Sequence, residues 1–133
     1  MSFRESLNLT GFPIISFENN ERWVNLLLDT GSNHSIINTN TLRDLVYTNL
    51  NGKSHVFGLN GEDQEGGYIV LPLQFKKKTY EMDCLSINME PTFKKMKEQF
   101  GVTVHGILGT DFFEKYKYVL DFNEMVAYNT VNK

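Results

Sequence analysis

Short runs of apolar residues separated by polar turns follow one another along this chain. Residues 12–17 and 22–29 are rich in strand-forming side chains and flank the polar turn Glu18-Asn19-Asn20-Glu21, a pattern typical of a hairpin. Further strands are predicted over residues 33–37, 54–59, 68–75, 79–88, 102–108, 118–122 and 125–130. Many short strands at close spacing indicate a mainly β fold, either a barrel or a sandwich.

Two or three short helices interrupt the strands. Residues 39–46 follow a possible Thr or Asn N-cap, residues 92–100 place Phe93, Met96 and Phe100 on one side, and residues 110–116 follow a glycine. The polar, glycine-rich stretch 60–67 lies between two strands and predicts a long hairpin with a flexible tip. A length of 133 residues fits a single domain spanning residues 1–133.

Composition and charge exclude several classes of protein. Hydrophobic residues make up 41% and charged residues 22%, and the net charge of -3 does not favour a nucleic-acid partner. The lysine runs 76–78 and 94–97 are short, and we interpret them as solvated faces. No window approaches the roughly 20 apolar residues of a membrane span, and residues 1–9 lack a signal-peptide pattern. We therefore expect a cytoplasmic protein without a membrane partner.

The segment that carries chemistry is Asp29-Thr30-Gly31-Ser32, which follows three consecutive leucines. A carboxylate at the end of a buried strand costs free energy unless it is hydrogen-bonded or functional. Gly31 permits a sharp turn that brings its N–H toward the carboxylate, and the Ser32 hydroxyl is placed to donate to it. The alternative is a strand that ends in an ordinary Asx-type turn.

A second segment, Ile107-Leu108-Gly109, also ends a predicted strand and precedes a short helix. Together the two segments resemble those of the retropepsin-like aspartic peptidases, in which the Asp-Thr-Gly loop is crossed by a later apolar strand ending in glycine. The resemblance implies a closed acid-protease-type β barrel with a flap hairpin. Order and spacing match over roughly residues 12–128, while specific identity is confined to the two motifs. The flap and substrate-binding positions it implies are Gly58, Leu59, Asn60 and Gly61.

The resemblance implies an aspartic endopeptidase that hydrolyses peptide bonds in extended polypeptide. Two carboxylates would activate one water by general acid–base catalysis, and this chain supplies only Asp29. The enzyme would therefore be active only as a homodimer, with Thr30, Gly31 and Ser32 supporting the loop and no cofactor. The chain departs from the retroviral pattern in its longer, more acidic flap region and in the extra helix over residues 92–100. The alternative is a peptide-binding or assembly module that keeps this fold without turnover.

Other reactive side chains give weaker signals. Asp111 follows Leu-Gly-Thr, and we interpret it as a helix cap rather than a catalytic acid. Cys84 lies in an apolar–polar run typical of a packed side chain. The three histidines His34, His55 and His105 have no metal-ligand spacing, so we expect no metal site.

Overall fold

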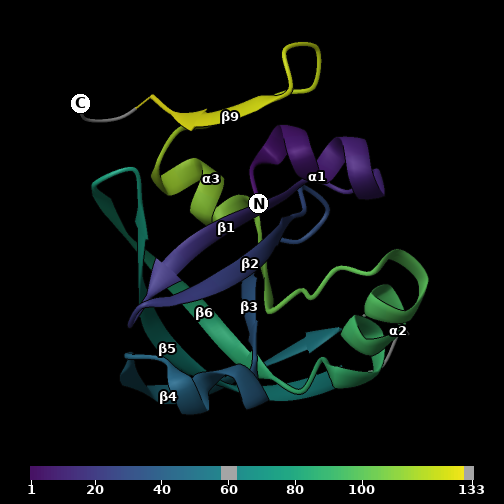
Figure 1. Ribbon diagram of the computed structural model, residues 1–133. Helices are drawn as coiled ribbons and strands as arrows, with labels where there is room; N and C mark the ends of the chain where they lie inside the picture. Colours follow the sequence, from purple (N-terminus) through teal and green to yellow (C-terminus); the bar gives the residue numbers. More distant parts are fainter. Residues whose placement is uncertain (58–62, 131–133) are drawn as a thin grey trace.

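The chain folds around a closed β barrel (Figure 1). The computed structural model describes the backbone of residues 1–57 and 63–130 and the side chains of residues 1–50 and 67–130. Its elements are α1 (Phe3–Thr10), β1 (Ile14–Asn19), β2 (Arg22–Leu28), β3 (Ser35–Asn38), the 3-10 helix η1 (Thr39–Asp44), β4 (Thr48–Phe57), β5 (Asp63–Phe75), β6 (Lys78–Ile87), α2 (Glu90–Phe100), β7 (Gly106–Leu108), α3 (Thr110–Lys115), β8 (Tyr118–Asp121) and β9 (Val126–Asn129). None of the described helices is long and apolar enough to cross a membrane.

Seven strands form one sheet in the order β1-β2-β7-β3-β6-β5-β4. The sheet closes on itself because β1 also pairs with β5, where Glu18 lies opposite Gln74. Strand β7 is inserted between β2 and β3, parallel to β2 and antiparallel to β3. A strand from late in the chain therefore crosses the end of β2, as the two sequence motifs predict.

The apolar side chains that alternate along the strands fill the barrel. Along β2, Val24, Leu26 and Leu28 are buried while Trp23 faces outward, which is the two-residue period of a strand with one buried face. One core cluster lies inside the barrel and continues to α3, and a second lies between the sheet and α2. Each fully buried Leu, Ile or Phe side chain contributes about 1.5–3 kcal/mol relative to exposure.

A separate hairpin, β8–β9, packs outside the barrel on α3 and α1. In Figure 1 β9 and α1 lie together at one end of the molecule, and β4 lies at the opposite end. Phe112 of α3 joins Tyr116 and Tyr118 in an aromatic cluster, with ring centroids 4.9 Å and 5.6 Å away. This cluster attaches the hairpin to the helix that follows the second motif.

The elements differ from the sequence predictions in a few places. Helix α1 was not predicted, although Ser2 caps it by accepting the Glu5 N–H and Gly11 ends it with a φ of 78°. The helix predicted over residues 39–46 is a 3-10 helix of residues 39–44 rather than an α-helix, and most of the predicted strand 102–108 is irregular ahead of Gly106. Strand β4 begins before the predicted start at residue 54, and β5 includes residues 63–67 of the predicted break.

Candidate active site

The Asp29 carboxylate is fixed at the point where β2 meets β7. Its backbone N–H donates to the Leu108 carbonyl at 2.9 Å, which continues the β2–β7 pairing by one residue. Its Oδ1 accepts the Gly31 N–H at 2.9 Å. Asp29 is only partly buried, and Thr30 and Gly31 are exposed. The carboxylate is thus held in place while its surroundings stay open on one side.

Gly31 lies in close contact with the acid. A Cβ atom at this position would lie 3.1 Å from Asp29 Oδ1, tighter than most real contacts of a Cβ. A side chain here would therefore compete with the N–H bond that orients the carboxylate.

Ser32 plays a different part from the predicted one. Its hydroxyl donates to the His34 carbonyl at 2.7 Å, and a hydroxyl has a single proton to donate. It therefore does not donate to Asp29 in this structure, and the prediction of a Ser32–carboxylate bond is wrong. The Ser32 hydroxyl bond instead tightens the loop between Asp29 and β3. The Ser32 carbonyl also accepts the Thr110 N–H at 2.8 Å.

Gly109 lies against this loop, directly after Ile107 and Leu108 of β7. A Cβ on Gly109 would meet the Ser32 carbonyl oxygen at 2.6 Å and the His34 carbonyl oxygen at 2.8 Å. Both are backbone atoms that cannot move aside without shifting the loop. The glycine thus lets two segments, eighty positions apart in the chain, cross in direct backbone contact.

A buried polar network that sequence reasoning missed holds this crossing together. The Ser35 hydroxyl accepts the Gly109 N–H at 3.0 Å and donates to Asp111 Oδ1 at 2.8 Å. The Ser35 N–H donates to Asp111 Oδ2 at 3.0 Å, and the Phe112 N–H donates to Oδ1 at 2.8 Å. Asp111 is therefore structural, as expected: it joins α3 to β3 and accepts a first-turn N–H of α3, although it is not the N-cap residue, which is Gly109.

His105 anchors the approach to β7. Its Nδ1 accepts the Asn25 N–H of β2 at 2.9 Å, and its backbone bonds to Asn25 and Asn38 join it to β2 and β3. An acceptor nitrogen requires the neutral ring. Burial of the ring lowers the pKa of His105, which keeps this neutral form favoured.

The remaining candidates lie elsewhere. Cys84 is buried in the barrel. Burial is the main cause that raises the pKa of its thiol, and the negative charges of Asp111 and Asp83 raise it further. Among the described side chains, those of residues 1–50 and 67–130, no three His, Cys, Asp or Glu gather as metal ligands. The predicted flap positions Gly58, Leu59, Asn60 and Gly61 lie outside the described residues, although the hairpin β4–β5 that leads to them is present.

Known structures share this overall fold. The EIAV protease in complex with the inhibitor HBY-793 is 20% identical, with a TM-score of 0.58 over 78% of this chain and 86% of that chain. The retroviral protease-like domain of Ddi1 from Leishmania major is 15% identical, with a TM-score of 0.62 over 90% of this chain and 88% of that one. No protein-family model and no curated protein matches the sequence. The barrel, the inserted strand β7 and these two structural neighbours together establish that the chain has the retropepsin-like fold.

Proposed function

We propose that this chain is one protomer of a homodimeric aspartic endopeptidase, with Asp29 as its catalytic carboxylate. The observation that carries the proposal is the setting of Asp29: it follows a buried strand, it is oriented by the Gly31 N–H, and it stays partly exposed. A carboxylate that is fixed, partly desolvated and open to one water has the properties of a general acid or base.

The proposed reaction needs two carboxyl groups around one water. Two carboxyl groups about 3 Å apart share one proton, because both cannot ionise together; the aspartic peptidase pair is the standard example of this effect. The ionised group takes a proton from the water, which attacks the scissile carbonyl carbon. The protonated group gives its proton to the carbonyl oxygen. The tetrahedral diol then collapses and the C–N bond breaks. The amine leaves with the proton that the first carboxyl took from the water, and one hydroxyl proton of the diol returns to the second carboxyl.

The proposal takes the second acid from another copy of the chain. Asp111 bonds to Ser35 beside the crossing, but both of its oxygens already accept bonds from Ser35 and Phe112. The exposed residues Thr30 and Gly31 leave the Asp29 side open to a second copy. A twofold axis beside Asp29 would bring the same loop of both protomers together.

The hairpin β4–β5 supports polypeptide as the substrate class. Four residue pairs of this hairpin, from Ser54 opposite Gly66 to Phe57 opposite Asp63, lie beyond the part of β5 that pairs with β6. An extended peptide can bind such a hairpin through main-chain hydrogen bonds, which recognise the backbone of many sequences.

The test is cleavage of an unfolded protein by purified wild type and by Asp29→Asn, from acidic to neutral pH. We expect Asp29→Asn to lower kcat/KM by about 10³-fold or more, because it removes a group that acts in the transition state. Asp83→Asn is the matched control, since it makes the same change on an exposed position of β6 and should keep full activity. Cleavage by Asp29→Asn at the wild-type rate contradicts the proposal.

The same experiment distinguishes the peptide-binding alternative. If the chain is a non-catalytic module, wild type and Asp29→Asn should bind the unfolded protein with equal affinity, and neither should cleave it. Sedimentation adds a second criterion, because a chain that stays monomeric at high concentration cannot pair its Asp29 carboxylates.

A further inference from the structure

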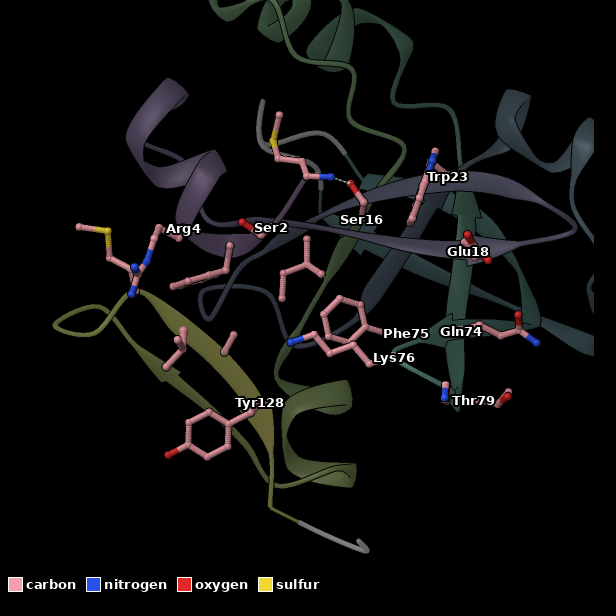
Figure 2. Close-up of a pocket in the computed structure, with 17 residues that line it drawn as sticks. Ser2, Arg4, Ser16, Glu18, Trp23, Gln74, Phe75, Lys76, Thr79 and Tyr128 are labelled. Atoms are coloured by element: carbon pink, nitrogen blue, oxygen red, sulfur yellow. Dashed lines mark hydrogen bonds between the residues drawn. The ribbon is translucent and has the colours of Figure 1, made fainter.

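A large hollow lies on the surface of this protein, and Asp29 is not among the residues that line it (Figure 2). It has a volume of about 1050 Å³ and is bordered by the end of β1, the start of β2, the β5–β6 turn, β9 and the start of α1. Trp23 lies on its margin near the start of β2, whereas Asp29 follows the end of that strand. Six residues of extended chain span about 20 Å, so this groove is separate from the candidate active site.

The groove has an apolar floor and aromatic margins. Phe3 and Ile15 are buried beneath it, and Phe75 and Ala127 are partly buried. On its margins Trp23 is 62% exposed, Tyr128 48% and Val126 39%. Figure 2 shows Phe75 and Lys76 between β1 and β9. Exposed aromatic side chains around an apolar floor are typical of a surface that binds a partner.

The charge of the groove is opposite to that of the chain. Its lining includes the cationic side chains of Arg4, Lys76 and Lys77 against the single carboxylate of Glu18, whereas the whole chain has a net charge of -3. Within the described part of the chain, neither Lys76 nor Lys77 has a carboxylate partner; the Lys76 ammonium lies over the Phe75 ring at 5.4 Å. The charge of this groove therefore favours an anionic partner.

Strand β9 offers backbone groups on the same side. Among the described strands, β9 pairs only with β8. Residues 125–128 line the groove, whereas no residue of β8 does. The Thr130 N–H donates to the Lys117 carbonyl, so alternate residues of β9 bond to β8. By this alternation the N–H and C=O of Ala127 point away from β8. The edge of β9 can thus accept another strand.

We propose that this groove binds an extended, acidic polypeptide segment that alternates carboxylate and apolar side chains and adds a strand to β9. The β9 edge would hold the peptide backbone, the apolar floor would take the side chains of one face, and Lys76 and Lys77 would pair with the carboxylates. The binding does not depend on Asp29, so it would occur whether or not the proposed peptidase activity exists.

Trp23 is the single tryptophan of the chain, so its fluorescence reports on this groove. The protein with Asp29→Asn, which removes cleavage, is titrated with a peptide of about eight residues, longer than a typical strand, that alternates Glu with Ile or Phe. The comparison peptides carry Lys in place of Glu, or N-methyl groups on alternate amides. We expect the acidic peptide alone to change Trp23 emission, with both comparison peptides binding about tenfold more weakly or worse.

Charge reversal locates the site. Lys76→Glu with Lys77→Glu should weaken the acidic peptide about tenfold or more. The matched control is Lys94→Glu with Lys95→Glu, the same change on exposed positions of α2, which should leave affinity within about twofold. Circular dichroism confirms that each variant is folded, and the N-methylated peptide tests the β9 edge without altering the protein.

Three results overturn the proposal. The first is equal binding of the acidic and the Lys-containing peptide. The second is equally tight binding of an oligothymidylate, which would indicate a general polyanion site. The third is a change of self-association in sedimentation, rather than of peptide affinity, when Lys76 and Lys77 are reversed, which would make a second copy of the chain the occupant.

Discussion

Replacing Ser35 by alanine should damage both the stability and the activity of this protein, because one hydroxyl holds the strand crossing together. Ser35 is 1% exposed, and its hydroxyl bonds to the Gly109 N–H and to an Asp111 carboxylate oxygen. Alanine removes both bonds and adds no group that could replace them.

The magnitude follows from the two lost bonds. A buried N–H left without an acceptor costs about 1–3 kcal/mol, and a hydrogen bond to a charged group contributes about 1.5–3 kcal/mol. The Ser35 N–H bond to Asp111 remains, so the carboxylate keeps a partner. We therefore expect a loss of about 3 kcal/mol in the free energy of unfolding, which lowers the folding equilibrium constant about a hundredfold.

The assay is urea unfolding of wild type, Ser35→Ala and Ser86→Ala at one protomer concentration, since dimerisation would make stability depend on concentration. Ser86 is the matched control: it lies on β6, which pairs with β3, and its hydroxyl bonds to Thr39 in an exposed pair. Its loss should cost about 0.5 kcal/mol or less. If Ser35→Ala is as stable as Ser86→Ala, the network does not hold the crossing.

Three further predictions concern the same frame. Gly109→Ala should destabilise the fold by about 3 kcal/mol in urea unfolding, because the new Cβ would meet backbone oxygens at 2.6 and 2.8 Å. The control Gly67→Ala should be nearly neutral, because a Cβ there would have nothing within 4 Å. Equal stabilities of the two variants would refute this prediction. Burial lowers the pKa of His105 below the ordinary 6.5. Between the lowered pKa and 6.5, the unfolded chain therefore binds more protons than the folded protein. Stability should therefore fall as pH drops below 6.5, and His105→Gln should flatten that fall; an unchanged slope contradicts it. Burial raises the pKa of the Cys84 thiol, so a thiol reagent should modify it only when the protein unfolds, and rapid labelling of the native state would be the contrary result.

Much of the fold could be predicted from local patterns. The leucines before Asp29 and the apolar pair before Gly109 indicated buried strand ends, and the structure places these ends side by side as β2 and β7. Residues 18–21 indicated the first hairpin, which forms with Asn20 and Glu21 at positive φ. These features depend on side-chain period and turn chemistry, which the sequence displays directly.

The polar contacts of the site could not be predicted in the same way. The sequence does not determine whether the Ser32 hydroxyl donates to Asp29 or to the His34 carbonyl, because both acceptors lie within three residues of it; the structure shows the bond to His34. The bond between Ser35 and Asp111 joins positions 76 residues apart, and no local pattern identifies such a pair. Helix α1 did have a local signal in Ser2 and Glu5, which is the spacing of a capping box.

The central claim is that two copies of Asp29 form one catalytic site, and a mixing experiment tests it most directly. Wild type and Asp29→Asn protein are unfolded together in varying ratio, refolded at constant total concentration, and assayed for cleavage. If both acids are required, activity follows the square of the wild-type fraction, and an equal mixture retains about one quarter of full activity. Activity proportional to the wild-type fraction, with about one half remaining in the equal mixture, would show that one Asp29 is sufficient and would contradict the account.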